Sequence, residues 1–425
     1  MGSKWSSLWR KEDWWSVWLG FLLMALVVAG VVTYVPKVDK WTAAPTLTLD
    51  NLASIVLLGV GLLVITAVAI YFMDKNVLKP YIAGFPLLFF LAFLGILIAS
   101  QETIHTYGLE YVLWALLFGL LISNTVGTPK WLEPATKSEL FIKIGLVLLG
   151  AEIVFQKILS GGIFGMVQAL IVVGAVWFAA YYLALKAGLG KSFASVLASG
   201  VSICGVSASI AAGGAVKAKP KEISYVISLV LLVAIPMLVG EPFIAKALGM
   251  PDAVAGAWIG GTIDTTPAVV AAGELYSEHA MTVASIVKMS QNVLIGVAAF
   301  LLALYWVLKV ERKPEERPSL AEVWYRFPKF IVGFVIASMV FSLVLTPMLG
   351  LDTVSGMLGL TKTFRKWFFA LAFVCIGLGT NFKELVKIGG GKPLLVFLAA
   401  QIFNIVLTLC VAYAIFGGLF FPPPV

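Results

Sequence analysis

Charged residues and the residues that serve most enzymes are scarce in this chain. Only 12% of its 425 residues are charged, and it contains two histidines and three cysteines. Cys204, Cys375 and Cys410 all lie in apolar segments without CxxC spacing, which argues against both a disulfide framework and a zinc site. No nucleophile–base arrangement, metal-ligand spacing or phosphate loop is evident. We therefore expect no enzymatic activity, no cofactor and no bound metal.

Apolar residues are abundant instead. They make up 60% of the chain, and the mean hydropathy is +1.00. Runs of about 20 apolar residues, the length that crosses a hydrocarbon core, recur along the whole sequence. The fold class predicted from them is an all-α integral membrane protein with about 11–13 transmembrane helices. The individual runs are 17–35, 52–73, 80–99, 108–126, 139–158, 163–185, 191–216, 222–245, 253–274, 280–308, 328–348, 365–386 and 393–417.

The net charge of +8 does not indicate nucleic-acid binding, because the basic residues lie in loops and form no face interleaved with aromatic residues. Their distribution favours a cytoplasmic N-terminus and an outer C-terminus. We expect one polytopic membrane domain, 1–425. Its expected parts are a Trp-rich N-terminal segment with peripheral spans (1–100), a first repeat with interrupted helices (108–310), a cytoplasmic loop (311–327) and the C-terminal spans of a second repeat (328–425).

Two internal similarities are visible. At an offset of 227 residues, Phe141, Gly150 and Phe155 correspond to Phe368, Gly377 and Phe382, and the count of spans makes this pair antiparallel, as inverted repeats require. At an offset of 60, the segment from Gly200 resembles the segment from Gly260. The same count makes this second pair parallel. Either 191–216 or 253–274 is then re-entrant, or the resemblance is compositional.

The segment from Gly200 reads GVSICGVSASIAAGG. Glycine and short hydroxyl residues loosen a helix, and main-chain groups freed at membrane depth need a partner from protein, water or a ligand. The N-terminus of a half-helix offers unpaired N–H groups and a partial positive charge, which suit an anion. Ser202, Ser207 and Ser209 can add hydroxyl donors. The alternative is that these small residues only permit close helix packing.

The segment from Gly260 reads GGTIDTTPAVVAAGE and differs by its aspartate. A carboxylate at membrane depth is costly unless it is paired, protonated or bound to a cation. Asp264 is flanked by three threonines, and Pro267 helps to break the helix. Proton carriage, sodium coordination and a structural pair with a lysine are the roles that this pattern allows.

Such a lysine is present in the next span, TVASIVKMSQNVLIGV. Lys288 stands near its middle, and Gln291 and Asn292 follow three and four residues later, so the three share one helix face. A polar face in so apolar a span indicates a cavity. Lys288 then pairs with the anion, with Asp264 or with both in alternation, unless it lies nearer an interface and snorkels.

Weaker signals lie beside glycines near the ends of other runs. They are Asn124, Glu152, Thr380 and Asn381, and each is either a cap or turn residue or a ligand. The expected substrate-binding residues are Ser202, Cys204, Gly205, Ser207, Ser209, Lys288, Gln291, Asn292, Thr380 and Asn381. The expected ion-coupling residues are Asp264, Thr262, Thr265 and Thr266.

Several of these segments together resemble the YeiH-type sulfate exporter family of bacterial membrane proteins. The segments are LLFGLLISNTVG, KIGLVLLGAEI, SGVSICGVSASIAAGGAVKA, IGGTIDTTPAVVAAGELYSE and ASIVKMSQNVLIG, and the likeness covers most of the chain. That family is similar to the sodium/proton antiporter and bile-acid transporter superfamily. The resemblance implies inverted repeats, crossing interrupted helices, a moving (elevator-type) core domain and alternating access, with a homodimer as the expected assembly.

The sequence thus predicts a multi-pass secondary transporter of the bacterial inner membrane. Its expected substrate is a small oxyanion such as sulfate, sulfite or a short sulfonate, coupled to H+ or Na+. A cation/proton antiporter is the alternative within transport. A membrane subunit of an ion-pumping decarboxylase, an ion channel and a structural scaffold are alternatives of other classes.

Overall fold

The regular secondary structure of the described part of the protein is helical. The computed structural model describes residues 11–45, 47–106, 111–153, 155–311, 328–381, 383 and 391–418. Within these ranges there is no β-strand, only an isolated bridge between Trp41 and Gln101. The predicted class, an all-α integral membrane protein, is confirmed. In the described part of the chain, seven segments are long and apolar enough to cross a membrane: Leu49–Met73, Lys75–Ala99, Gly161–Lys186, Tyr225–Ala247, Glu278–Val310, Lys329–Leu349 and Lys392–Phe416.

The chain forms two compact units, each built from two separate stretches. Unit 1 comprises Met1–Gln156 and Lys329–Asn381, and unit 2 comprises Lys157–Pro328 and Phe382–Val425. The subdivision expected from the sequence (1–100, 108–310, 311–327 and 328–425) stays a prediction. Residues 312–327 of the expected loop lie outside the described residues.

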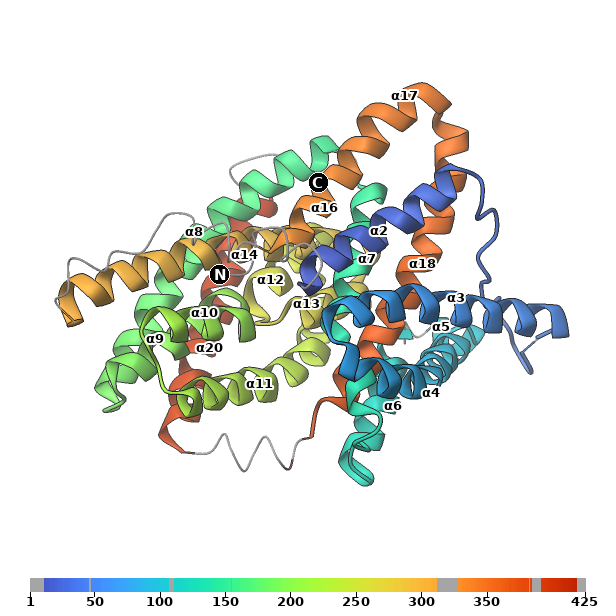
Figure 1. The fold of residues 1–425 in the computed structure, drawn as a ribbon. Coiled ribbons are helices and arrows are strands. Elements are labelled where there is room, and N and C mark those ends of the chain that lie inside the picture. The colour runs from blue at the N-terminus through green and yellow to red at the C-terminus, as the bar shows by residue number, and fades with distance from the viewer. Residues whose placement is uncertain are drawn as a thin grey trace. The chain divides into compact units, whose positions relative to one another are not determined.

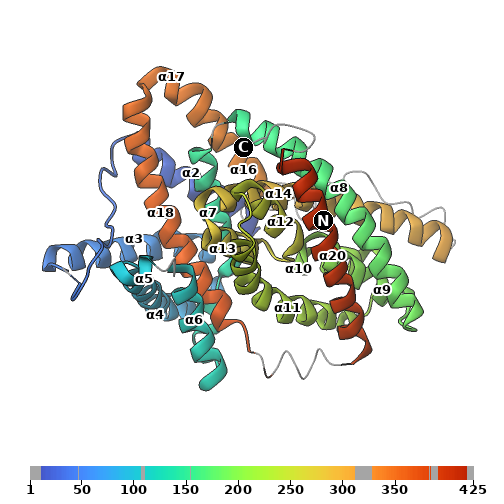
Figure 2. The ribbon, with the colours of Figure 1, turned by 180° about the vertical axis from the view of Figure 1, so that it is seen from behind.

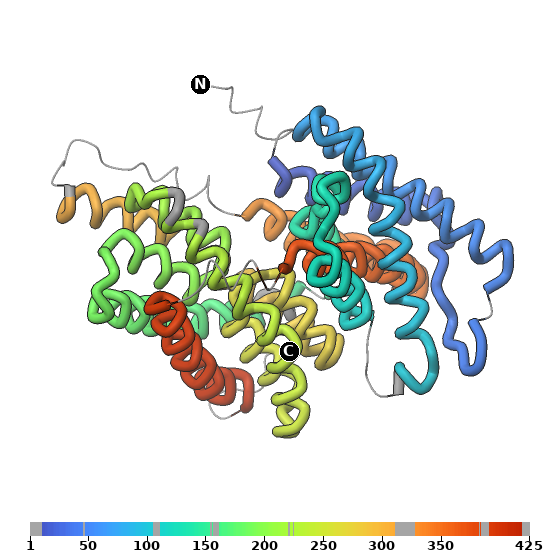
Figure 3. The backbone as a smooth tube through the Cα atoms, turned by 90° about the horizontal axis from the view of Figure 1, so that it is seen from below, coloured from blue at the N-terminus to red at the C-terminus, as the bar shows by residue number. Residues whose placement is uncertain are grey.

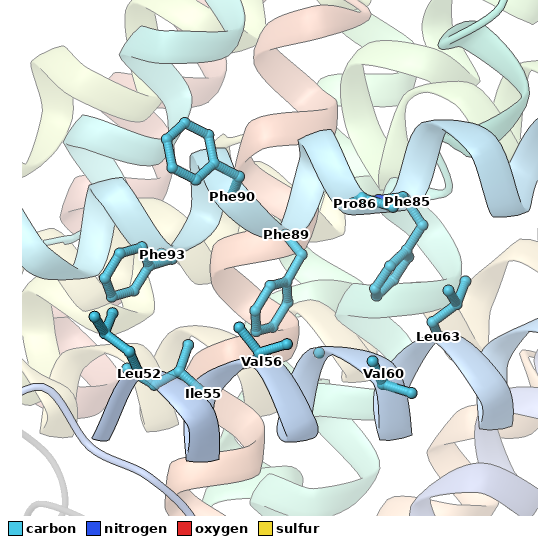
Figure 4. A pocket seen from close by; sticks show the side chains of 11 residues that line it. Leu52, Ile55, Val56, Val60, Leu63, Phe85, Pro86, Phe89, Phe90 and Phe93 are labelled. Atoms are coloured by element: carbon cyan, nitrogen blue, oxygen red, sulfur yellow. The ribbon is translucent and has the colours of Figure 1, made fainter. Parts of the chain in front are cut away.

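Unit 1 contains a pair of long antiparallel helices, α3 and α4 (Figure 3). A cavity of about 370 Å³ lies between them, where Phe85, Phe89 and Phe93 of α4 point toward α3 (Figure 4). All its lining residues are apolar, so it offers nothing to an ion. The elements of unit 1 are α2 (Glu12–Val28), α3 (Leu49–Met73), α4 (Lys75–Ala99), α5 (Glu102–Thr106), α6 (Tyr111–Thr125), η1 (Glu133–Ala135), α7 (Ser138–Glu152), α16 (Lys329–Met339), η4 (Val340–Leu345), α17 (Thr346–Leu349) and α18 (Leu351–Leu378).

Helices α7 and α18, which carry the similarity at offset 227, pack antiparallel. Gly145 lies against Phe369, and Arg365 donates two hydrogen bonds to Glu152, from Nε to Oε1 (2.9 Å) and from Nη2 to Oε2 (3.0 Å). Arg365 is 3% exposed. Glu152, expected as a cap or a ligand, is therefore one half of a buried ion pair that holds these two helices together. Phe382, the last residue of the similarity, lies outside the described residues.

The equivalent glycines of α7 and α18 have equivalent surroundings. A methyl group at Gly150 would collide with the carbonyl oxygen of Phe334 in α16, and one at Gly377 with that of Leu116 in α6. Gly150 of α7 therefore allows close approach to α16, which comes before α18 in the chain. Gly377 of α18 likewise allows close approach to α6, which comes before α7. Small residues serve this purpose in membrane helix packing.

Unit 2 contains long helices around two short, interrupted segments (Figure 1). Helix α14 passes both segments and α11 connects them along the chain. The elements are α8 (Phe155–Lys186, which starts at the boundary with unit 1), α9 (Lys191–Ser199), η2 (Gly200–Cys204), α10 (Val206–Ala215), α11 (Pro220–Ala247), α12 (Asp252–Thr262), α13 (Thr266–Tyr276), α14 (Glu278–Tyr305), η3 (Trp306–Glu311) and α20 (Lys392–Phe416).

The first interrupted segment folds back on itself. A methyl group at Gly200 would lie 2.8 Å from Oγ of Ser209, whereas a straight helix would separate these residues by about 13 Å. The outer ends of α9 and α10 also meet. Glu222 accepts hydrogen bonds from Oγ of Ser192 (3.0 Å) and from the main-chain N–H of Lys219 (3.1 Å). We call 191–215 hairpin 1.

The second interrupted segment is also a hairpin (Figure 2). Helix α12 runs parallel to α14, with Gly256 against Ala280 and Gly260 against Ala284, whereas α13 runs antiparallel to it, with Gly273 against Met281. The two outer ends meet where Oγ of Ser277 donates to Oδ2 of Asp252 (2.7 Å). We call 252–276 hairpin 2.

These hairpins correct the predicted spans. Neither 191–216 nor 253–274 crosses unit 2 from one end to the other, because each turns back at its interruption. Hairpin 1 meets the first turn of α11, and hairpin 2 follows the last turn of α11. Since a helix of 28 residues is about 42 Å long, the hairpins enter unit 2 from opposite ends. The pair at offset 60 is thus antiparallel, and the parallel arrangement that the count of spans suggested was wrong.

Charge separates the two ends of unit 2. The end at which hairpin 1 enters, here the basic end, carries Lys186, Lys191, Lys217, Lys219, Lys309 and Lys392, together with the acidic Glu222. The end at which hairpin 2 enters, here the acidic end, carries Lys246, Asp252, Glu274 and Glu278. Because hairpin 1 turns back, Lys217 and Lys219 join the basic end and sharpen the asymmetry that the sequence showed.

Labelling from one side of the membrane tests these hairpins. In a protein without Cys204, Cys375 and Cys410, we expect cysteines placed at Gly190 and Lys219 to react with a membrane-impermeant maleimide from the same side. Cysteines at Leu248 and Glu278 should react only from the other side. If positions 190 and 219 reacted from opposite sides, 191–215 would be a crossing helix and not a hairpin.

Candidate functional site

The tips of the two hairpins meet inside unit 2. A methyl group at Gly205 would lie 3.1 Å from the carbonyl oxygen of Asp264 and 3.3 Å from its Cβ, and also against Val230 of α11. Gly205 has a φ of +57°, a conformation that residues with a side chain rarely adopt. Glycine is needed here for both the turn and the close approach. The interruptions that the sequence predicted near Cys204 and Thr265 are confirmed.

The tip of hairpin 1 is a π-helical turn that ends at Gly205. Ser202 donates its hydroxyl hydrogen to the carbonyl of Ala198 (2.7 Å), so this hydrogen is already used within the helix. Ser207 is exposed, whereas Ser209 is buried against Gly200. Cys204 is buried in an apolar cluster with Ile203 and Val173.

Helix α10 begins at this tip and directs its N-terminus to the meeting point. Its first N–H groups, those of Val206, Ser207 and Ala208, have no acceptor in the described part of the chain. Unpaired N–H groups at a helix N-terminus carry a partial positive charge. They are the donors that the sequence led us to expect for an anion.

The tip of hairpin 2 is the extended turn Ile263–Asp264–Thr265 between α12 and α13. Thr265 caps α13, since its Oγ1 accepts the N–H of Ala268 (3.4 Å). Asp264 is 2% exposed, and its Oδ2 accepts no hydrogen bond from any described residue. The aspartate therefore occupies the interior with an unsatisfied oxygen.

The polar face of α14 supports both tips. Lys288, 1% exposed, donates from Nζ to the carbonyl of Ile203 (2.8 Å) and to Oε1 of Gln291 (2.9 Å). Gln291 donates to the carbonyl of Gly261 (3.0 Å), and Asn292 donates to Oγ1 of Thr266 (3.0 Å). Lys288 is thus buried and does not snorkel to an interface. It lies beyond the 4.0 Å limit of an ion pair from every described carboxylate, including Asp264.

A second buried carboxylate, not predicted from the sequence, belongs to this site. Glu241 of α11 is 4% exposed, and its Oε2 accepts the hydroxyl hydrogen of Thr262 (2.7 Å). Its Oε1 has no partner among the described residues. In the sequence Glu241 stands between Gly240 and Pro242 near the end of an apolar run, which resembles a loop.

Helix α20 contributes a polar face that sequence reasoning also missed. Gln401 donates to the carbonyl of Thr262 (2.8 Å), and Asn404 donates more weakly to the same carbonyl and to that of Val201 (both 3.4 Å). Thr408 donates to Oδ1 of Asn404 (2.8 Å). These three residues follow the i, i+3, i+7 spacing of one helix face, so the signal was present in the sequence.

Oxygen atoms without donors gather around the two tips. Within the described residues, buried side-chain oxygens that lack a partner include Oδ2 of Asp264, Oε1 of Glu241, Oδ1 of Asn292 and Oε1 of Gln401. A buried acceptor without a partner is costly. Protons or a small cation would satisfy these atoms. No group of three or more described His, Cys, Asp or Glu residues is placed to hold a metal ion.

Thr380 and Asn381 belong to a different place. They lie at the end of α18 in unit 1, where Ser123 and Asn124 donate to the carbonyl of Thr380 (2.7 and 2.9 Å) and Asn381 donates to the carbonyl of Ser123 (3.1 Å). These contacts join α18 to α6. Of the expected substrate residues, these two are therefore not brought together with Lys288 inside unit 2.

A family model described as "Conserved hypothetical protein 698" matches residues 83–397. The chain belongs to the UPF0324 membrane protein family. A UPF0324 membrane protein of Rhodopirellula baltica is 44% identical over 91% of the chain and 72% of its own length. One from Nitratidesulfovibrio vulgaris is 43% identical over 86% of the chain, which spans only 65% of that relative. One from Nitrosomonas europaea is 31% identical over 100% of the chain and 99% of its own length.

The family assignment agrees with the resemblance found in the sequence. None of these names states a substrate. No solved structure matches the chain.

The contact of Gln401 with hairpin 2 predicts a stability effect. Gln401→Leu leaves the carbonyl of Thr262 with only its long contact to Asn404, so we expect the free energy of unfolding to fall by about 2 kcal/mol. Thermal unfolding of the purified protein in detergent measures this. Gln101→Leu is the matched control: the same change at a less buried glutamine of unit 1, whose three hydrogen bonds are exposed or partly buried. If the two variants were equally stable, α20 would not hold the tip.

Proposed function

We propose that this UPF0324 protein is a secondary transporter that moves a small oxyanion, of the sulfate, sulfite or short sulfonate class, by alternating access coupled to H+ or Na+. One observation carries the proposal. Two hairpins enter from opposite ends of unit 2, and their tips meet beside a buried lysine and two buried carboxylates. A solely structural membrane protein has no use for so many unsatisfied polar atoms at membrane depth.

The donors near the tips suit an oxyanion. An ammonium group has three N–H donors, and Lys288 uses two of them for Ile203 and Gln291. The third N–H of Lys288, the free N–H groups of α10 and the hydroxyl of Ser207 can bind an anion while the two existing hydrogen bonds of Lys288 stay in place. In this proposal Ser202, Cys204, Gly205 and Ser209 shape the tip.

The acceptors suit the coupling ion. Asp264 contacts Gly205 at the tip of hairpin 1, and Glu241 accepts a hydrogen bond from Thr262 in hairpin 2. Protonation, or binding of Na+ with help from Thr262, Thr265 and Thr266, would neutralise the carboxylates while an anion is bound. When that ion leaves, the carboxylates are charged again and repel the anion. Transport of the anion is thereby coupled to transport of the ion.

The lysines suggest the orientation. Basic residues mark the cytoplasmic side of membrane proteins, so we place the basic end of unit 2 in the cytoplasm and the acidic end outside. A cytoplasmic N-terminus and an inner-membrane location, expected from the sequence, are part of this proposal. The approach of the hairpins from opposite ends is the arrangement expected of an inverted repeat.

A cation/proton antiporter is a second candidate, favoured by one observation. Four side-chain oxygens, of Asp264, Glu241, Asn292 and Gln401, accept no hydrogen bond from the described residues. The side-chain donors named above for an anion are fewer: the third N–H of Lys288 and the hydroxyl of Ser207. In such an antiporter Na+ and protons would compete for the two carboxylates, and Lys288 would serve only to hold the tip of hairpin 1.

Flux into proteoliposomes tests the proposal. We expect Lys288→Met to lower uptake of radiolabelled sulfate or sulfite by roughly 100-fold, since a hydrogen bond to a charged group contributes about 1.5–3 kcal/mol. Asp264→Asn should abolish the dependence of uptake on a proton or sodium gradient. Asp352→Asn, an exposed aspartate of unit 1, is the control.

Two outcomes would count against this assignment. Wild-type rate and coupling in both Lys288→Met and Asp264→Asn would exclude the proposed roles. Sodium-dependent proton flux that is lost in Asp264→Asn, without any oxyanion transport, would instead establish the antiporter.

A further inference from the structure

A groove on unit 2, separate from the hairpin tips, has an aromatic wall. It is a cavity of about 390 Å³ between α8, α9 and α14, a size within the range of about 300–1,000 Å³ found for ligand pockets. One wall consists of Trp177, Phe178, Tyr181 and Tyr182 of α8. The facing wall is formed by leucine, alanine and tyrosine side chains of α14.

The aromatic wall is fixed in place and does not collapse into the groove. Trp177 donates from Nε1 to Oγ of Ser199 (3.0 Å), which ties the indole to α9. Tyr181 stacks on Trp177, with ring centroids 5.0 Å apart and planes 13° apart, and Tyr182 stacks on Phe178 at 6.5 Å and 21°. The groove is thus open while its wall is ordered, and Phe178 and Tyr182 remain 57% and 58% exposed.

The length and direction of the groove match one leaflet of a bilayer. Its lining extends along α8 from Val173 to Tyr182, about 14 Å of helix. This is close to half of the roughly 30 Å hydrocarbon core. Val173 also packs in the apolar cluster with Ile203 and Cys204, so the groove begins beside the tip of hairpin 1, and its lining continues along α8 toward the basic end.

Three lysines lie at the end of the groove that is nearer the basic end of unit 2. Lys186 lies in the last turn of α8, Lys191 is the first residue of α9, and Lys309 lies in η3, which continues α14. All three are exposed, and none forms an ion pair with a carboxylate of the described chain. Each helix that lines the groove therefore places a lysine at the same end, where the carboxylate of Glu222 in α11 bonds to Ser192 and forms no ion pair with these lysines. Tyr182 and Tyr305 lie one turn deeper, at the depth where aromatic residues mark the headgroup boundary.

We propose that this groove binds an anionic phospholipid of the cytoplasmic leaflet, with one acyl chain between α8 and α14 and the phosphate held by Lys186, Lys191 and Lys309. The aromatic and aliphatic walls suit an acyl chain, and the lysines suit a phosphate. The cavity between α3 and α4 in unit 1 has a similar volume, and neither lining contains a charged residue. The groove in unit 2 differs because each of its three helices carries an exposed lysine four residues from the nearest lining residue: Lys186, Lys191 and Lys309.

A lipid in this groove would also affect hairpin 1. Ser199, which accepts the Trp177 hydrogen bond, directly precedes the π-helical turn of hairpin 1. A bound chain would hold α9 against α8 and so stabilise the interruption at Gly205. Lipid binding itself does not depend on the proposed transport function, and it can be measured without transport.

Lipid binding to the purified full-length protein tests this inference. Native mass spectrometry in detergent, with phosphatidylglycerol and phosphatidylcholine added at equal concentration, counts the bound molecules of each. We expect the wild type to retain phosphatidylglycerol preferentially. The triple variant Lys186→Gln, Lys191→Gln, Lys309→Gln should bind it roughly 100-fold more weakly, because each basic residue near an anionic surface contributes about 1 kcal/mol. Its control is Lys37→Gln, Lys40→Gln, Lys130→Gln, three exposed lysines of unit 1.

A second variant fills the groove without altering charge. Gly174 lines the groove, and a methyl group at this position would have no other atom within 4 Å, so Gly174→Leu should fold and displace the acyl chain. Gly61→Leu, at an equally open glycine of α3, is its control. We expect Gly174→Leu to lose phosphatidylglycerol retention and Gly61→Leu to keep it.

Three results would overturn the proposal. One is equal retention of the two lipids by the wild type. Another is unchanged retention of phosphatidylglycerol in both the triple variant and Gly174→Leu. The third is a dimer that Gly174→Leu dissociates while lipid retention stays the same, which would assign the groove to a second copy of the chain.

Discussion

The need to satisfy main-chain polar groups inside a membrane governs unit 2. Both hairpins stop at membrane depth, and each stop frees carbonyl and N–H groups that no lipid can satisfy. The protein supplies partners from two helices: Lys288 and Gln291 of α14 bond to the carbonyls of Ile203 and Gly261, and Gln401 of α20 bonds to that of Thr262. Among the described residues, these partners leave the first N–H groups of α10, Oδ2 of Asp264 and Oε1 of Glu241 unsatisfied. In the proposed function these atoms bind the substrate anion and the coupling ion.

Unit 1 shows the opposite use of polar groups. Ion pairs join charges of its interior: the buried Arg365 with the partly buried Glu152, and the partly buried Lys143 with Glu12 and Asp13 at 3.0 Å each. Gly150 and Gly377 bring main chains into direct contact, and paired charges and close helix packing make a rigid assembly. The contrast between satisfied polar groups in unit 1 and unsatisfied ones in unit 2 is what places the candidate site in unit 2.

Much of the site could be read from the sequence, because breaks in apolar runs are visible there. Glycine and hydroxyl residues predicted the interruptions near Cys204 and Thr265, and the rarity of charge in membrane spans singled out Asp264 and Lys288. The sequence raised a re-entrant segment as one alternative, but it could not show that both segments turn back. Segments 191–216 and 253–274 are long enough to cross a membrane, and composition does not distinguish a kinked crossing helix from a hairpin. The contacts that decide, Ser192 with Glu222 and Ser277 with Asp252, join residues far apart in the sequence.

The contact between the two hairpin tips is the central claim, and a cross-link measures it directly. Gly205 stays unchanged, because its φ of +57° and its contact with Asp264 require glycine. In a protein that keeps Cys204 as its only native cysteine, Asp264→Cys adds a second thiol beside it. We predict that a short thiol-specific cross-linker joins this pair and not the control pair Cys204 and Lys246→Cys. A folded protein that forms no cross-link between positions 204 and 264 would contradict the account.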